Sequence, residues 1–237
     1  MVDFKAHASS SAGNLYTVTD GGKTLVIECG VRFKTLQSAL GFSLSSVSGL
    51  LVSHAHQDHA ACIQDVLRAS VPCYMSEGTA QALGVAGHHR THILTGLRQV
   101  DIGGWTVLPF GVIHDADEPL GFLIVAPGGD RLVYAVDTAY VPYRFERLSV
   151  IAIEANFSLD TIRRNVASGE IALSHKNRVI QNHMSIERAL DMLRANDLSQ
   201  VREIHLLHLS DGNSDAEAFR RQVQELTGKP VYVAARQ

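Results

Sequence analysis

Residues 53–59 read SHAHQDH, which places three histidines and one aspartate close together in the chain. Imidazole nitrogens and carboxylate oxygens are ligands that zinc, manganese and iron accept in proteins. The apolar run GLLV comes directly before them and is typical of a buried strand. Residues at i and i+2 of a strand project to the same side, so His54 and His56 can share one metal ion. Asp58 and His59 follow in a turn toward a helix, from where they can reach a second metal ion.

The alternative interpretation of this HxHxDH motif is a polar turn in which Asp58 caps the following helix. Histidine is frequent in this chain, with twelve residues among 237. Even so, this spacing arises by chance in roughly one chain in several hundred at such a composition. The spacing therefore favours a metal-binding motif.

A centre with two metal ions needs about six or seven protein ligands, more than the motif supplies. Three further polar residues each follow an apolar, β-rich run: His114 after VLPFGVI, Asp137 after RLVYAV and His208 after EIHLL. Strand ends are places where a sheet delivers side chains to a site. Singly, each of the three would be an ordinary edge residue. Together with the motif, they make a complete ligand set for two metal ions.

The elements that must position these residues alternate between short β-rich runs and helical patterns. Two runs on either side of a Gly-Gly pair predict a hairpin. A capping box of Ser214 and Glu217 predicts the start of the last helix. Strands in both halves with helices between them predict a layered α/β sandwich in one domain. The predicted strands are NLYTVTD, KTLVIECG, VSGLLVSH, VPCYMS, WTVLPFGVIH, LGFLIVAPGG, DRLVYAVDT, LSVIAIEAN, REIHLLHLS and VYVAA; the predicted helices are RFKTLQSALG, AACIQDVLRAS, GTAQALG, SIERALDMLRAN and SDAEAFRRQVQELTG.

Composition narrows the classes of protein. The formal net charge is −3, so no global positive field attracts nucleic acid or a membrane surface. Cys29, Cys62 and Cys73 are odd in number and lack zinc-finger spacing, which favours reduced, buried thiols. The N-terminal residues do not resemble a signal peptide, and no apolar stretch has membrane-spanning length. We expect a cytoplasmic protein without a membrane partner.

In its motif and in the order of the later His, Asp and His, the sequence resembles the metallo-β-lactamase superfamily. The resemblance covers nearly the whole chain and is strongest to the YycJ/WalJ-like branch. The first loop differs mildly, because the branch usually has a glycine among the serines there. The segments similar to that branch are ASSSAGN, IHDADEPLGFLI, VDTAY, EAN, NHMS and LLHLSDGNSD.

The resemblance implies a single domain over residues 1–237, a four-layer αβ/βα sandwich with a binuclear metal site at one edge. It implies two divalent metal ions, zinc or manganese, with iron also suited to the ligands. One ion would be held by His54, His56 and His114, the other by Asp58, His59 and His208, with Asp137 bridging the two.

Two close metal ions would lower the pKa of a bridging water and so produce hydroxide near neutral pH. A phosphodiester also needs an acid that protonates the leaving oxygen. The resemblance places His183 beside the site, and an imidazole can donate a proton near pH 7. The alternative is a surface histidine ahead of Ser185, which would cap a helix. Asp58 and His183 are the predicted catalytic residues.

Two loops of small polar residues are candidates for binding phosphate. An ordinary tight turn and a helix-entry loop are equally good interpretations of them. The cluster His88, His89 and His92 could hold a metal ion or contact nucleic acid, but we favour an exposed loop. The candidate phosphate ligands are Ser10, Ser11 and Asn14 in the first loop, and Ser210 and Asn213 in the second.

The predicted function is a binuclear metal-dependent phosphodiesterase, and within that class a nuclease resembling a 5′-to-3′ exonuclease. Its partner would be nucleic acid or a nucleotide. The first alternative is a phosphodiesterase on small or cyclic nucleotides, which the slightly acidic charge favours. Further alternatives are hydrolysis of an ester, thioester or lactam, and an inactive binding scaffold. Metal identity and oligomeric state stay open, a homodimer included.

Overall fold

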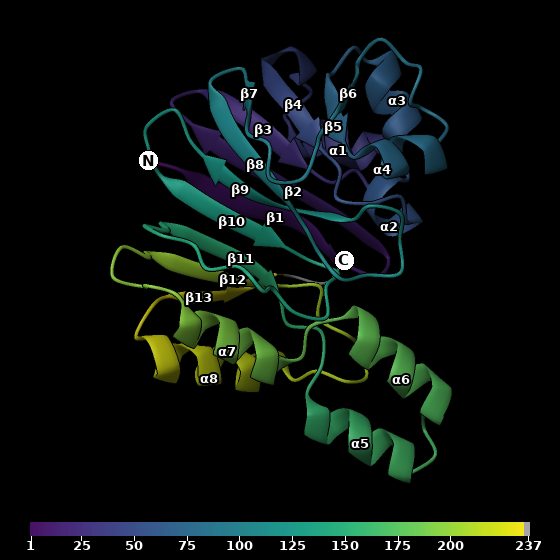
Figure 1. Ribbon diagram of the computed structural model, residues 1–237, viewed down its shortest axis with the longest axis vertical. Coiled ribbons are helices and arrows are strands. Elements are labelled where there is room, and N and C mark those ends of the chain that lie inside the picture. The colour runs from purple at the N-terminus through teal and green to yellow at the C-terminus, as the bar shows by residue number, and fades with distance from the viewer. Residues whose placement is uncertain (235–237) are drawn as a thin grey trace. The chain divides into compact units, whose positions relative to one another are not determined.

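The computed structural model describes residues 1–234 (Figure 1). These residues divide into two compact units. The first unit comprises residues 1–111 and 116–130, and the second comprises residues 112–115 and 131–234. The prediction of a single domain over the whole chain stays a prediction.

The first unit contains a sheet whose strands follow one another in chain order. The sheet is antiparallel among its first three strands and parallel from β3 to β6. A core of buried apolar residues, among them Val26, Leu36, Leu50 and Val66, packs the helices against it. The strands are β1 (Asp3–Ser10), β2 (Gly13–Asp20), β3 (Lys23–Ile27), β4 (Val47–Leu51), β5 (Cys73–Met75) and β6 (Thr91–Ile93); the helices are α1 (Phe33–Ala39), η1 (Leu44–Ser46), α2 (Gln57–Ala60), α3 (Ile63–Arg68) and α4 (Glu77–Ala82).

The first unit also contains an antiparallel meander of three strands. These are β7 (Val100–Ile102), β8 (Trp105–Gly111) and β9 (Leu120–Val125). The backbone N–H of Leu120, at the start of β9, donates to the carbonyl of Ser53 at 2.9 Å. This bond ties the meander to the segment that leads into the HxHxDH motif.

The second unit is built on four parallel strands with four helices. Every residue of β11 is buried, as expected for a parallel strand covered on both faces. Each helix buries an apolar face, for example Met192 and Leu193 on α7 and Phe219 and Val223 on α8. The strands are β10 (Arg131–Ala135), β11 (Val150–Glu154), β12 (Glu203–Leu207) and β13 (Val231–Val233); the helices are α5 (Leu159–Ala167), α6 (Leu173–Asn182), α7 (Ile186–Ala195) and α8 (Ala216–Thr227).

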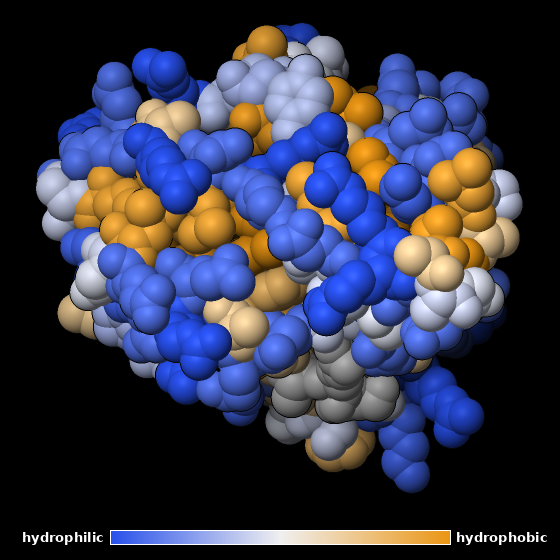
Figure 2. All heavy atoms as spheres, turned by 90° about the horizontal axis from the view of Figure 1, so that it is seen from below, coloured by the Kyte–Doolittle hydropathy of each residue, from blue (hydrophilic) through white to orange (hydrophobic). Residues whose placement is uncertain are grey.

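The outer faces of these helices are largely polar. Figure 2 views the molecule from below, the side on which α5 and α8 lie in Figure 1. Hydrophilic residues (blue) cover most of that face, and hydrophobic residues (orange) gather in separate patches. Among the residues that the structure describes, no helix is long and apolar enough to span a bilayer.

Most predicted elements are present, and the differences have physical reasons. The predicted hairpin is formed by β2 and β3, and Gly21 and Gly22 take the positive φ angles that its turn needs. The predicted cap Ser214 is wrong: its hydroxyl donates to the Ser210 carbonyl, and Asp215 caps α8 by accepting from the Ala218 N–H. The last predicted strand, VYVAA, forms over Val231–Val233, and its final residue lies outside the described part of the chain.

Gly30, just after β3, makes room for the HxHxDH motif. Its N–H donates to the Asn14 carbonyl at 3.0 Å, and the neighbouring Cys29 N–H donates to the His59 carbonyl at 2.8 Å. A Cβ atom at Gly30 would collide with the backbone carbonyl of Asp58. Only glycine allows the two backbones to approach this closely.

We therefore expect Gly30→Ala to lower the free energy of unfolding by about 1–3 kcal/mol or more, the usual cost of overpacking. Gly87→Ala is the matched control, because a Cβ atom there meets nothing within 4 Å and its φ is not left-handed. Urea unfolding midpoints measure the difference. Equal midpoints for the two variants would show that the close approach does not constrain this region.

Candidate metal centre

The first unit brings the four polar residues of the HxHxDH motif together. His54 follows the end of β4, His56 precedes α2, and Asp58 and His59 lie within α2. The ring centroid of His54 lies 4.6 Å from that of His56 and 4.2 Å from that of His59. The Asp58 Oδ2 lies 3.4 Å from the His59 Nε2. The motif is therefore folded as a compact group of metal-ligand side chains.

Buried polar residues around the motif hold these side chains in place. Glu28, fully buried, has Oε1 3.4 Å from the His59 Nδ1. Its Oε2 accepts from the backbone N–H of Ser53 at 3.3 Å. The Ser53 hydroxyl lies 2.9 Å from the His54 Nδ1. Histidines that bind metal ions commonly have one ring nitrogen held by such a partner, which fixes the ring and leaves the other nitrogen to bind.

Asn14 connects the first loop to the motif. Its side chain is fully buried, and its Nδ2 donates to the Asp58 carbonyl at 3.1 Å and lies 3.1 Å from the His59 Nε2. Its Oδ1 accepts from the Tyr16 hydroxyl at 2.9 Å. These contacts use the amide of Asn14, so it positions the motif and is not available to a phosphate.

The second unit gathers a second group around Asp137, which is buried. The two carboxylate oxygens of Asp137 face different histidines: Oδ2 lies 3.5 Å from the His114 Nε2, and Oδ1 lies 3.2 Å from the His208 Nδ1. Asp137 and His208 both adopt left-handed backbone conformations, with φ of 51° and 53°, at the ends of β10 and β12. Such conformations are unfavourable for these residue types and often occur at functional sites.

The surroundings of His114 favour the neutral form of its ring. Its Nδ1 donates to the Asn182 carbonyl at 3.1 Å, which directs its Nε2 toward Asp137. Burial lowers the pKa of His114, and this effect outweighs the attraction of the Asp137 carboxylate. A histidine must be neutral to bind a metal ion, so the lowered pKa suits that role.

His183, the predicted acid, lies beside Asp137 and is only partly exposed. Its Nδ1 lies 2.7 Å from the Glu154 Oε1 and 3.3 Å from the Asp137 Oδ1. Burial disfavours its imidazolium, but the two carboxylates outweigh burial and raise the pKa of His183 to about 11. Ser185 does cap α7, by accepting from the Arg188 N–H at 3.3 Å, yet this does not place His183 on the open surface. The two carboxylates therefore favour the protonated form of the His183 ring.

Glu154, at the end of β11, contacts both His183 and His208 of this group. It is fully buried, and its Oε2 accepts from the Thr138 and Met184 N–H groups at 3.0 Å each. Burial raises the pKa of Glu154, but the charge and hydrogen bonds of His183 and His208 outweigh burial and lower it overall. Glu154 is therefore a carboxylate that orients His183.

The donor chemistry of this group fits a divalent metal ion. Asp137, Glu154, His183 and His208 carry donor atoms that lie within 4.8 Å of one another. Glu154 and His183 bond to each other, so Asp137 and His208 are the two of this group that are candidates to bind an ion. Carboxylate oxygens with imidazole nitrogens suit zinc, manganese and iron alike, so the donors do not select among them.

The remaining predicted phosphate ligands differ in exposure. Ser10 and Asn213 are buried and bonded within the protein: the Ser10 hydroxyl accepts from the Ala12 N–H, and the Asn213 Oδ1 accepts from Asn165. Ser11 is exposed and Ser210 is half-buried. Of the five candidates, these two keep a hydroxyl near solvent.

The histidine cluster at 88–92 has the features of a surface loop. The rings of His88 and His89 stack with centroids 4.6 Å apart, and His92 stacks on Tyr74 at 4.7 Å. Within residues 1–234, none of these histidines belongs to a group of three or more metal-ligand side chains.

Three supporting residues, Glu28, Glu154 and Asn156, were not among the predicted site residues. Asn156 donates to the His208 carbonyl at 2.8 Å and so fixes the backbone of that histidine. Glu28 and Glu154 follow the apolar runs KTLVI and VIAI. The rule that found Asp137, a polar residue after an apolar β-run, would have found them too.

Comparison with known proteins agrees with this geometry. Residues 23–208 match the family model described as the Beta-lactamase superfamily domain. The chain is 27% identical to the exodeoxyribonuclease YycJ of Bacillus anthracis, covering 94% of this chain and 88% of that protein. It is also 27% identical to the exodeoxyribonuclease WalJ of Streptococcus pneumoniae D39, covering 89% of this chain and 82% of that protein.

Solved structures share the fold at low identity. The metallo-β-lactamase fold protein YhfI from Bacillus subtilis has a TM-score of 0.74 at 16% identity, covering 99% of this chain and 97% of that one. A diphosphatase from the PhnP family has a TM-score of 0.70 at 15% identity, covering 100% of this chain and 96% of that one. The predicted αβ/βα fold class and the resemblance to the YycJ/WalJ-like branch are confirmed. The chain thus belongs to the metallo-β-lactamase superfamily and is a metal-dependent hydrolase.

Proposed function

We propose that this protein is a metal-dependent exodeoxyribonuclease that hydrolyses phosphodiester bonds with two divalent metal ions. The observation that carries the proposal is the similarity to two exodeoxyribonucleases over about nine-tenths of the chain. The 5′-to-3′ polarity belongs to the proposal and rests on the same resemblance.

The proposed ligands are those that the sequence suggested: His54, His56 and His114 for one ion, and Asp58, His59 and His208 for the other. Asp137 would bridge the ions. Supporting this role, its two carboxylate oxygens already face different histidines, His114 and His208, which are assigned to different ions. A monodentate ligand would not need both oxygens directed in this way.

The chemistry divides between the ions and the protein. When bound, two divalent ions supply a water activated near neutral pH and stabilise charge on the phosphate. The protein supplies the acid: Glu154 holds His183 through Nδ1, so the Nε2 proton is the one that His183 gives to the leaving oxygen. Asp58 contributes as a ligand whose backbone is fixed by Asn14.

The second candidate is a phosphodiesterase acting on small or cyclic nucleotides, favoured by the net charge of −3. Purified protein loaded with Mn²⁺ or Zn²⁺ is assayed on 5′-phosphorylated DNA, a cyclic nucleotide and bis-p-nitrophenyl phosphate. The exonuclease proposal expects stepwise release of nucleotides from the DNA 5′ end. Turnover of the cyclic nucleotide alone would favour the second candidate. Protein that holds two metal ions but turns over none of the three would refute both.

Asp137→Ala should lose bound metal, because it removes the carboxylate that joins the two ligand groups. We expect the metal content, measured by mass spectrometry after dialysis, to fall from two ions per chain to one or none. Asp191→Ala is the control, since its exposed carboxylate pairs only with Arg194 on α7. Unchanged stoichiometry in the Asp137 variant would contradict the bridging role.

His183→Ala should keep its metal ions and lose turnover of DNA by about 10²–10⁴-fold, the usual contribution of a general acid. The loss should be much smaller on bis-p-nitrophenyl phosphate, because p-nitrophenolate leaves without a proton. His175→Ala, an exposed position on α6, serves as the control. Loss of metal would instead identify His183 as a ligand, and equal losses on both substrates would argue against an acid.

Glu154→Gln tests how the acid is tuned. The carboxylates raise the pKa of His183 to about 11; bound metal ions would oppose the share that Asp137 contributes, so the share of Glu154 is the one that this variant tests. Removing the charge of Glu154 should lower that pKa and move the alkaline limit of DNA turnover to lower pH. The pH–rate profile measures this shift, with the exposed Glu225→Gln as control. An unchanged alkaline limit would mean that Glu154 does not tune the acid.

A further inference from the structure

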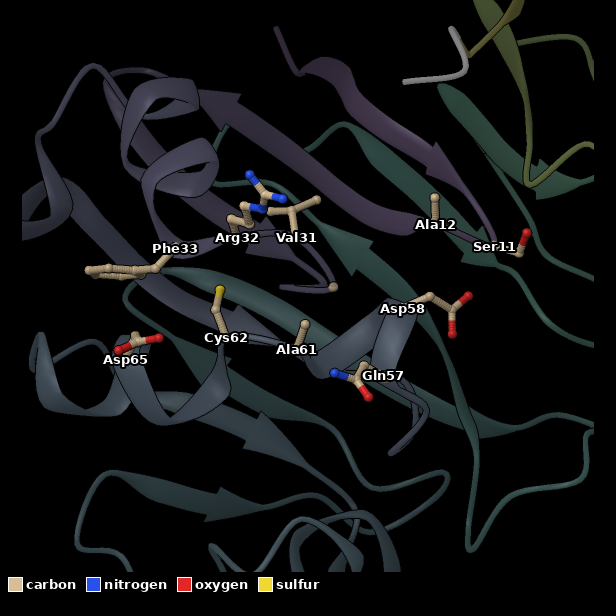
Figure 3. Close-up of a pocket in the computed structure, with 11 residues that line it drawn as sticks. Ser11, Ala12, Val31, Arg32, Phe33, Gln57, Asp58, Ala61, Cys62 and Asp65 are labelled. Atoms are coloured by element: carbon tan, nitrogen blue, oxygen red, sulfur yellow. The ribbon is translucent and has the colours of Figure 1, made fainter.

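The first unit has two cavities that metal binding does not explain, and one of them lies next to the HxHxDH motif. The first has a volume of about 580 Å³ and is lined by Ser11, Gln57 and Asp58 together with Arg32 and Phe33 (Figure 3). Figure 3 shows Ser11 and Asp58 toward one end of this cavity and Phe33 toward the other, with Arg32 between them. The cavity therefore begins at a proposed metal ligand.

The second cavity, also of about 580 Å³, is lined by Lys5, His7, Arg32 and Lys34 with small residues of α1. Arg32 lines both cavities, so they adjoin along its side chain. β1 and the turn after it run from Lys5 to Ser11. At about 3.3 Å per residue, this segment is roughly 20 Å long, enough for several nucleotides of one strand.

The charge along this path is positive. Lys5, Arg32 and Lys34 are exposed, and no carboxylate lines the second cavity. In the first cavity, Asp65 pairs with Arg68 at 2.5 Å, and Asp58 is a proposed metal ligand. Three positively charged side chains therefore line the two cavities, in a chain whose net charge is −3.

Phe33 adds an aromatic surface to the same path. It is partly buried against the core, with its ring at the wall of the first cavity. Proteins that bind single strands combine a basic groove, which follows the phosphates, with aromatic rings on which unpaired bases stack. A duplex keeps its bases paired and offers no such face to a single ring.

We propose that the two cavities form one track, lined by Lys5, Arg32, Lys34 and Phe33, which binds a single DNA strand and leads it to Asp58. The lysines and Arg32 contact the phosphates, and Phe33 stacks on a base. This inference rests on the proposed nuclease function and names the form of its substrate.

The test is binding of a fluorescein-labelled oligothymidine with phosphorothioate linkages, which resist hydrolysis, to Mn²⁺-loaded protein. Anisotropy is measured at several salt concentrations for the unchanged protein and for Lys5→Gln/Lys34→Gln. The double variant should bind roughly tenfold more weakly. Its salt slope should be smaller by about 1.4, because each contact between a cation and a phosphate of a single strand contributes about 0.7.

Lys23→Gln/Arg98→Gln is the matched control, because it removes two exposed positive charges of the first unit outside both cavities. It should bind the strand as the unchanged protein does. Equal weakening in both double variants would overturn the track, since overall charge would then explain the binding. An unchanged salt slope in Lys5→Gln/Lys34→Gln would overturn it as well.

Phe33→Leu keeps an apolar side chain against the core and removes the ring. It should weaken binding by at least about fivefold, the lower end of the roughly 1–3 kcal/mol that stacking of one base contributes, without changing the salt slope. Competition identifies the occupant: thymidine monophosphate, duplex DNA or oligouridine that displaces the strand at equal nucleotide concentration would refute a track for single-stranded DNA. Turnover of bis-p-nitrophenyl phosphate by the unchanged protein tests the metal centre alone, so a failure of the proposed function is recognised separately.

Discussion

The charge balance around Asp137 governs the cluster of buried polar residues in the second unit. Asp137 and Glu154 are both buried, and each lies within hydrogen-bonding or ion-pair distance of the His183 Nδ1. Two buried carboxylates side by side repel each other and lose hydration, so they stay ionised only with positive charge near them. The imidazolium of His183 meets part of that need, which is why its pKa rises to about 11 in spite of burial. Divalent cations meet the same need, and the cluster therefore has both the ligands and the electrostatic reason to bind them.

In each unit, charged and imidazole side chains of the candidate site follow the ends of strands. Glu28 after β3, Asp137 after β10 and His208 after β12 all have positive φ, between 51° and 63°. A residue with a Cβ atom adopts this conformation at a cost of about 1–3 kcal/mol, so the surrounding structure must hold it. Hydrogen bonds hold two of these residues in place. The Glu28 N–H donates to the Leu51 carbonyl on β4, and the Asn156 side chain donates to the His208 carbonyl. The buried strands thus provide the stability that the strained residues need.

Much of this arrangement could be predicted from the sequence, because buried strands leave a simple pattern. An apolar β-run followed by a histidine or aspartate identified His114, Asp137 and His208, and the structure gathers these three residues in the second unit. The short strands β6 and β7 were missed, because three residues are too few to show an alternation, and only pairing with neighbours makes them strands. Ser214 and Asp215 could both have capped α8, and the choice depended on the Ser210 carbonyl, which sequence does not locate.

Function depends on local charge, which composition conceals. A net charge of −3 argues against a nucleic-acid partner only if positive residues are spread evenly. The fold instead brings Lys5 on β1 together with Arg32 and Lys34 at the start of α1 around one cavity. The turn after β1 contributes Ser11 to the adjoining cavity, and Asn14 on β2 bonds to the Asp58 carbonyl, so the β1–β2 hairpin reaches both the basic path and a proposed metal ligand. A DNA strand bound along β1 would therefore be guided by the same hairpin that positions Asp58, which couples binding of the substrate to the place where it is cut.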